Sequence, residues 1–202
     1  MPEKSSDAAD QALKRPPSGE GLERFAGRFV LLRQLGRGGM GTVHLALDLS
    51  TRTECALKRL DPHTVRVAPG SLRHEFELLT RVRHPAVVTV HELGFAPDGT
   101  PYFTMEYVPG LPADRALAAG DWRALCLVAA EAADGLEALH AAGVVHGDLK
   151  PSNLLVIPGG GPDGEARGAT LPAGVRLLDF GLASLLGRDD QGHRGTPGFA
   201  AP

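Results

Sequence analysis

The chain has 202 residues, of which 43% are hydrophobic and 22% are charged, and its formal net charge is −3. This length suits one domain or a small pair, and the composition excludes a chain that is disordered throughout. The slightly acidic balance gives no overall basic field of the kind that gathers on nucleic acid or on anionic membranes, so we expect neither as a partner.

Cysteine content and hydropathy bound the compartment. The two cysteines, Cys55 and Cys126, lie far apart, and the chain does not start with a charged and then apolar leader. No apolar run approaches the roughly 20 residues of a membrane-spanning helix. We therefore expect a cytoplasmic protein with no disulfide framework and no membrane segment. We expect Cys126, which lies on a predicted helix, to be a residue of the hydrophobic core.

The chain begins with a polar stretch and continues with strands. Residues 1–24 contain Pro16 and Pro17 and lack a sustained apolar period, which predicts a disordered leader. Short strands are predicted at 28–36, 42–49 and 54–60, with a glycine cluster between the first two.

A helix and two further strands complete the first half. Residues 71–85 have helical periodicity, with Leu72, Phe76 and Leu79 on one face, Glu75 in the middle of that face and Glu77 on the opposite side. Strands are predicted at 86–95 and 101–108, which makes five strands with one helix inserted after the third.

The second half is mainly helical. A long helix rich in alanine and leucine is predicted over 121–142, with Asp121 capping its start and Gly143 its end. Residues 158–174 are of low complexity, which predicts a flexible insertion between short strands at 153–157 and 175–180. The change of character places a boundary near residues 109 and 110.

Two patterns stand out in the first half, a glycine-rich turn, which by itself also fits a turn without function, and a lysine with a glutamate partner. The stretch LGRGGMGTV places Gly36, Gly38 and Gly41 in a G-x-G-x-x-G pattern, and glycine lets backbone N–H groups approach phosphates closely. A strand follows these glycines, whereas a dinucleotide-binding turn opens a helix. Lys58 lies on the next strand, and Glu75 on the apolar face of the following helix needs a cation, so we expect the two to pair.

In chain order, LGRGGMGTV, CALK, Glu75, HGDLKPSN, LLDFGLA and GTPGFAAP resemble the motifs of a eukaryotic-like serine/threonine protein kinase of the bacterial type, over residues 28–202. The resemblance implies an α+β protein-kinase-like two-lobe fold. Its N-lobe, 25–108, would hold an antiparallel five-stranded sheet with one helix, and its helical C-lobe, 109–202, would be incomplete because the chain stops at the APE motif. We expect regulatory domains beyond Pro202.

The resemblance also implies roles for individual residues in transferring the γ-phosphoryl group of ATP to a Ser or Thr hydroxyl of a protein substrate. Asp148, Lys150, Lys58, Glu75 and Thr196 would be the catalytic set, and Asn153 and Asp179 would hold Mg²⁺. The stretch TMEYVPG, residues 104–110, would be the hinge between the lobes. The nucleotide would be bound by the glycine loop, by Lys58, by the hinge and by the residues around the adenine ring: Leu35, Gly36, Gly38, Gly39, Gly41, Val43, Ala56, Met105, Glu106, Val108 and Leu155. His146 and Phe180 are expected to be packing residues.

Gly147 departs from the family pattern, in which an arginine precedes the catalytic aspartate and binds a phosphate on the activation segment. Ser184 is the only hydroxyl residue in 182–195, and it lies close to the DFG motif. The missing arginine and the lack of a suitable phosphorylation site together predict a kinase of the non-RD type, which needs no phosphorylation of its activation loop.

Two alternatives remain open from the sequence. The pattern HGDLxxxN also resembles small-molecule phosphotransferases that act on aminoglycosides or choline. The other alternative is a non-catalytic kinase-like module that binds nucleotide, because the C-lobe is incomplete. Lys58, Asp148, Asn153 and Asp179 are all present, which favours catalysis.

Overall fold

The structure is a computed structural model that describes residues 22–39, 41–63, 69–118, 121–159 and 171–180, except the side chains at 69–72, 74 and 75. The predicted leader up to residue 21, most of the predicted insertion, Ser184 and Thr196 lie outside the described residues.

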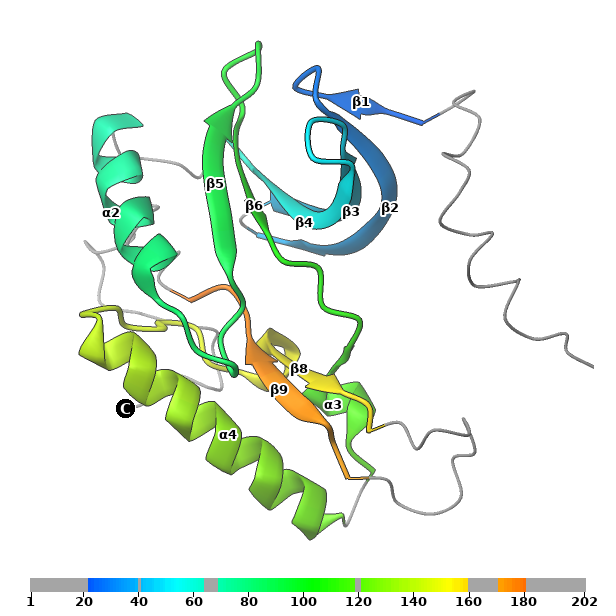
Figure 1. Cartoon of the computed structure of the whole chain (residues 1–202), viewed down its shortest axis with the longest axis vertical. Helices are drawn as coiled ribbons and strands as arrows, with labels where there is room; N and C mark the ends of the chain where they lie inside the picture. The colour runs from blue at the N-terminus through cyan, green and yellow to red at the C-terminus, as the bar shows by residue number, and fades with distance from the viewer. Residues whose placement is uncertain (1–21, 40, 64–68, 119–120, 160–170, 181–202) are drawn as a thin grey trace, which may run out of the picture.

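The first half forms a curled antiparallel sheet (Figure 1). Its strand order is β1-β2-β3-β4-β6-β5, so β6 lies between β4 and β5, although it follows β5 in the chain. The strands are β1 (Arg24–Phe25), β2 (Phe29–Gly38), β3 (Gly41–Asp48), β4 (Thr53–Leu60), β5 (Val90–Phe95) and β6 (Pro101–Met105).

The sheet has six strands, where the sequence predicts five, because the two-residue β1 pairs with the start of β2. A strand this short carries no periodic signal. Ala26 and Gly27 turn the chain with φ of 50° and 69°, and this turn places Phe25 against Tyr102, with ring centroids 5.2 Å apart. Tertiary packing of one aromatic ring therefore supports the additional strand.

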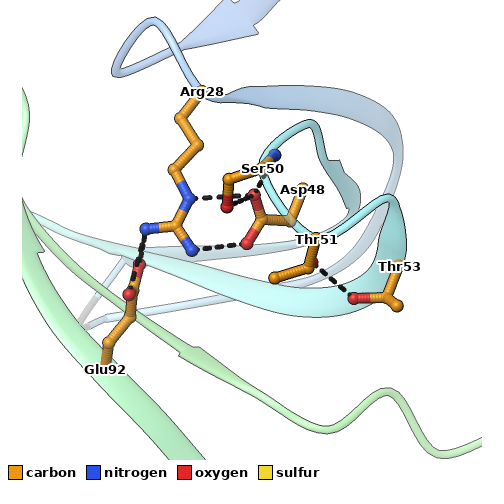
Figure 2. A network of polar contacts seen from close by, with 6 residues as sticks. All are labelled: Arg28, Asp48, Ser50, Thr51, Thr53 and Glu92. Atoms are coloured by element: carbon orange, nitrogen blue, oxygen red, sulfur yellow. Dashed lines mark hydrogen bonds and ion pairs between the residues drawn. The ribbon is translucent and has the colours of Figure 1, made fainter.

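An ion-pair network connects the start of β2 and the end of β3 with β5 (Figure 2). Arg28, just before β2, donates from Nε to Asp48 Oδ1 at 2.8 Å and from Nη1 to Glu92 Oε1 on β5 at 2.7 Å. The Ser50 hydroxyl also donates to Asp48 Oδ1, at 2.7 Å. The Arg28 guanidinium and the Ser50 hydroxyl hold the pKa of Asp48 well below its usual range. The curl of the sheet brings these residues together.

Helix α2 (Pro69–Arg81) lies against β5 (Figure 1). Phe76 and Leu79 are buried and Glu77 is exposed, as the helical period predicts. Phe76 also contacts Phe103 of β6, with ring centroids 6.1 Å apart. The apolar face of the helix thus covers one side of the sheet.

The segment predicted as one strand at 86–95 is divided into two parts in the structure. Its second part is β5, whereas Val87 forms an isolated parallel bridge with Leu177 in the other half of the molecule. Val88 donates to the Leu177 carbonyl at 3.1 Å, and Leu177 donates to the Ala86 carbonyl at 2.8 Å. The two lobes are therefore joined by backbone hydrogen bonds as well as by the hinge after β6.

The second half contains a three-stranded sheet, in the order β7-β8-β9, packed on a long helix (Figure 1). Its elements are β7 (Leu111–Pro112), α3 (Ala113–Ala116), α4 (Trp122–Ala141), the 3₁₀ turn η1 (Pro151–Asn153), β8 (Leu154–Ile157) and β9 (Gly174–Leu177).

Both predicted ends of the long helix are confirmed. The Asp121 side chain accepts a hydrogen bond from the Ala124 N–H at 3.0 Å. Gly143 has φ of 75° and donates to the His140 carbonyl at 2.9 Å, while Val144 donates to the Leu139 carbonyl at 2.9 Å. These two bonds form a Schellman motif, which needs the left-handed glycine.

The prediction that Cys126 is a core residue is wrong, because its side chain is exposed. Helix α4 buries the face that carries Ala124, Val128, Ala132, Gly135 and Leu139. Cys126 lies on the opposite face together with Trp122, which is 65% exposed, and Leu125 on the flank between the two faces is 56% exposed. Apolar residues occur on both faces of this helix, so its sequence alone does not indicate which face is covered.

Candidate active site

The glycine loop is the end of the hairpin between β2 and β3, where Gly38 and Gly41 are paired. A Cβ atom on Gly36, Gly38 or Gly39 would have no other heavy atom within 4 Å. Gly41 differs, because its φ is 137° and a Cβ atom there would lie 1.9 Å from the Arg59 carbonyl oxygen. The fold itself therefore requires glycine at 41, whereas the other glycines leave open space beside the backbone.

Lys58 lies on β4 with 4% of its surface exposed. Its Nζ atom forms an ion pair with Asp179 Oδ2 at 2.7 Å, which compensates for burying the ammonium group. The predicted partner, the Glu75 side chain, lies outside the described residues. Asp179 has φ of 59°, an unfavourable backbone conformation for a residue that is not glycine.

The loop after α4 gathers the polar residues of the HGDLKPSN motif. Asp148 Oδ2 lies 2.6 Å from Lys150 Nζ. Asn153 is buried in η1, and its Nδ2 atom donates to the Asp148 carbonyl at 2.8 Å and to Asp148 Oδ2 at 3.3 Å. The backbone carbonyl of Asn153 in turn accepts a hydrogen bond from the Leu178 N–H at 2.9 Å. This bond links the Asp148 loop to the segment that carries Asp179.

His146 is a packing residue, as predicted, with 3% of its surface exposed. Its Nδ1 atom accepts a hydrogen bond from the Asp148 N–H at 3.3 Å. Burial lowers the pKa of His146, so the imidazole is neutral at pH 7. Phe180 is also buried and belongs to the main core.

The predicted adenine-site residues come from both lobes. Val43 is the cross-strand partner of Lys58, and Ala56 lies two positions before Lys58 on the same strand. All three side chains therefore project from one face of the sheet. Met105 is buried at the end of β6 as the strand partner of Ala56, and half-buried Leu155 comes from β8 in the other lobe.

Glu106 in the hinge makes contacts that the sequence does not predict. Glu106, just after β6, accepts a hydrogen bond from the Thr89 N–H and forms an ion pair with Arg176 of β9. The only sequence signal is a charged residue within the apolar strand VRLL. Val108 follows in the hinge, and Leu35 is 37% exposed near the glycine loop.

Within the described part of the chain, no group of three or more His, Cys, Asp or Glu side chains could hold a metal ion. No helix in these same ranges is long and apolar enough to cross a membrane.

The chain is similar to known proteins in both sequence and structure. The protein kinase domain family matches residues 29–202. The chain is 36% identical over 188 residues to the serine/threonine-protein kinase pkn2 of Myxococcus xanthus, covering 87% of this chain and 21% of pkn2. It is 34% identical to the DNA damage-responsive serine/threonine-protein kinase RqkA of Deinococcus radiodurans, covering 88% of this chain and 26% of RqkA.

A solved structure is also similar. The crystal structure of the PknI kinase domain from Mycobacterium tuberculosis, determined on a mutant form, superposes with a TM-score of 0.60 at 30% identity. The match covers 80% of this chain and 62% of the PknI chain. The chain thus spans about a quarter or less of the length of pkn2 and RqkA and about three fifths of the PknI kinase domain.

Proposed function

Because the chain belongs to the protein kinase domain family, we propose that it binds ATP with Mg²⁺ between its two lobes and transfers the γ-phosphoryl group to a Ser or Thr hydroxyl of a protein. The observation that carries this proposal is the meeting of Lys58, Asp179, Asp148 and Asn153 at the junction of the lobes, joined by the bond from the Leu178 N–H to the Asn153 carbonyl.

Asp148 is the residue that we assign to the substrate hydroxyl. Its carboxylate accepts the hydroxyl proton while the substrate oxygen forms a bond to the γ-phosphorus and the bond from that phosphorus to the β,γ-bridging oxygen breaks. Lys150, 2.6 Å from Asp148 Oδ2, supplies positive charge for the transferring phosphoryl group. The amide of Asn153 fixes the orientation of Asp148 through its two hydrogen bonds.

The residues present suit ATP. Open space beside Gly36, Gly38 and Gly39 leaves room for phosphate groups against the backbone, which a side chain would occupy. Lys58 would contact the α- and β-phosphates, and Val43, Ala56 and Leu155 would enclose the adenine ring. The backbone groups of Glu106 and Val108 would bind the adenine edge beside Met105, with Leu35 at the entrance.

Asp179 and Asn153 also suit Mg²⁺. The side-chain nitrogen Nδ2 of Asn153 donates to Asp148, so the side-chain oxygen Oδ1 is the atom that would bind the ion, and Asp179 offers a carboxylate. Magnesium prefers such oxygen ligands, and it typically uses few protein groups besides water and substrate phosphates. When bound, the ion would neutralise charge on the β- and γ-phosphates.

The regulatory part of the proposal rests on Gly147, which has no side chain to bind a phosphate on the activation segment. We expect this kinase to act without activation-loop phosphorylation. Ser184→Ala should therefore retain the parent's rate of phosphoryl transfer. A Ser184→Ala protein that unfolds at the parent's temperature yet has lost its activity would contradict this expectation.

The test of the function separates nucleotide binding from transfer. Thermal unfolding should shift to higher temperature with Mg²⁺ and ATP in the parent, but not in Lys58→Met. Asp148→Asn should retain that shift yet lose transfer of radiolabelled phosphate to a Ser/Thr protein substrate by at least about 100-fold. A parent indifferent to nucleotide would overturn the proposal, and transfer to an aminoglycoside or choline instead of protein would redirect it.

A further inference from the structure

Glu106 is held more firmly than a hinge residue in an exposed loop would be. Its N–H donates to the Thr89 carbonyl at 2.9 Å, and its Oε1 atom accepts from the Thr89 N–H at 3.2 Å. These reciprocal bonds fix both the backbone and the side chain of Glu106 to the segment that connects α2 with β5. The same Oε1 atom lies 3.4 Å from Arg176 Nε.

Arg176 is well placed to orient this carboxylate. It lies on β9 between Val175 and Leu177, which are both fully buried, so its backbone cannot shift easily. Its Nη1 atom donates to the Val175 carbonyl at 3.0 Å, which holds the guanidinium toward its own strand. The Arg176 side chain is 26% exposed and that of Glu106 is 34% exposed, so water only partly screens the pair.

Arg176 also lies next to Leu155, which is one of the residues proposed to enclose the adenine ring. It is the cross-strand partner of Leu155 on β8, so the two side chains project from the same face of the small sheet. Three residues later the same segment reaches Asp179, the partner of Lys58. One short segment thus contacts the hinge at one end and the phosphate site at the other.

We propose that Arg176 is a positioning residue for the nucleotide base, which holds Glu106 so that the backbone carbonyl of this hinge residue faces the adenine edge. The inference rests on the proposed ATP-binding function and adds a residue that the motifs do not include. Because the contact acts at the base, its loss should weaken every adenine ligand equally, whether or not the ligand carries phosphates.

A matched control exists on the neighbouring hinge residue. Tyr107 also contacts an arginine, since Arg33 Nη2 on β2 donates to the Tyr107 hydroxyl at 2.8 Å. This contact is exposed and involves only the side chain of Tyr107, through its hydroxyl and through its ring, whose centroid lies 5.8 Å from Arg33 Cζ. Arg33→Ala should therefore leave adenine binding within about twofold of the parent.

The experiment is calorimetric titration of Mg-ATP and of adenosine into the parent, Arg176→Ala, Arg176→Lys and Arg33→Ala, with unfolding temperatures measured in parallel. Arg176→Ala should weaken both ligands by the same factor, about three- to tenfold, with Arg176→Lys between it and the parent. In a Glu106→Gln background, Arg176→Ala should cause a smaller further loss, because the ion pair is already broken.

The outcomes distinguish the inference from the function on which it rests. Failure of the parent to bind ATP, or binding unaffected by Lys58→Met, would overturn the proposed function and this inference with it. ATP binding that depends on Lys58 but is the same in Arg176→Ala as in the parent would overturn the inference alone. A loss confined to Mg-ATP, with adenosine unchanged, would also overturn it, because the effect would then arise at the phosphates.

Discussion

At the level of single residues, the glycines of the G-x-G-x-x-G pattern have different physical requirements. Gly41 is required by its own backbone, since its φ is positive and the Arg59 carbonyl occupies the place of a side chain. Gly38 has neither a positive φ nor a neighbour within 4 Å of a Cβ atom. The described structure therefore gives no packing reason for glycine at 38, and the proposed ATP site supplies one, since phosphates would approach the backbone there.

Alanine substitutions should separate these two requirements. Gly41→Ala should lower the free energy of unfolding by at least about 1 kcal/mol, because strain and overlap both act on the folded chain. Gly38→Ala should change stability by less than about 0.5 kcal/mol yet weaken ATP binding. Thermal unfolding and ATP titration check both, and equal stability of the two variants would contradict the assignment.

The backbone conformation at position 147 favours glycine, independently of the missing arginine that would bind a phosphate. Its φ is 76°, in the left-handed region, between buried His146 and the carboxylate of Asp148. A side chain at this position costs free energy that glycine avoids, and asparagine tolerates the conformation better than branched residues do.

Substitutions at Gly147 should therefore follow backbone preference. We expect Gly147→Val to lower the free energy of unfolding by about 1–2 kcal/mol and Gly147→Asn by clearly less. Chemical denaturation of the two variants and the parent measures this order. If Gly147→Val were as stable as the parent, the left-handed conformation would not be what selects glycine here.

At the level of strands and helices, the ion pairs of Arg28 join β2 and β5 across the curl of the sheet (Figure 2). Asp48 keeps its charge in the folded chain because the pKa of its carboxyl group is depressed. The contribution of the Asp48 carboxylate to the stability of the folded chain is therefore complete above about pH 4, near the pKa of an aspartate in an unfolded chain. This contribution is lost as the pH falls toward the lower pKa that Asp48 has in the folded chain.

Arg28→Met should thus lower the free energy of unfolding at pH 7 by about 1–3 kcal/mol, because Asp48 and Glu92 both lose a partner. The difference between the parent and Arg28→Met should shrink as pH falls below about 4, where Asp48 becomes protonated in the variant. Denaturation at several pH values tests this, with exposed Arg33→Met as the control. A difference that does not change with pH would contradict the role of Asp48.

Across the molecule as a whole, the close packing of α4 on β9 positions the segment that leads to Asp179. A Cβ atom on Gly135 would lie 2.7 Å from Leu177 Cδ1 and 3.2 Å from the Ala86 carbonyl oxygen. Gly135 therefore lets the helix approach both the strand and the segment that joins the lobes. Leu177 is fully buried, so it has little room to move away.

Gly135→Val should lower the free energy of unfolding by about 1–3 kcal/mol and reduce the thermal shift produced by Mg-ATP, because Leu177 precedes Asp179 by two residues. Ala133→Val, on the exposed side of the same helix, should have a much smaller effect on both. A normal nucleotide shift in Gly135→Val would show that the helix does not position the site.

Neighbouring residues in the chain are enough to specify the elements with strong periodic or capping signals, such as α2 and the ends of α4, and the order of the kinase motifs. The chemistry of such local patterns can be read directly from the sequence. Four features required the folded chain: Lys58 pairs with Asp179, Cys126 is exposed, Phe25 supports a sixth strand and Arg176 contacts Glu106. The packing of the two lobes brings Lys58 to Asp179 and Arg176 to Glu106. The curl of the first sheet brings Phe25 to Tyr102, and the packing of α4 on β9 decides which face of that helix is covered and so leaves Cys126 exposed.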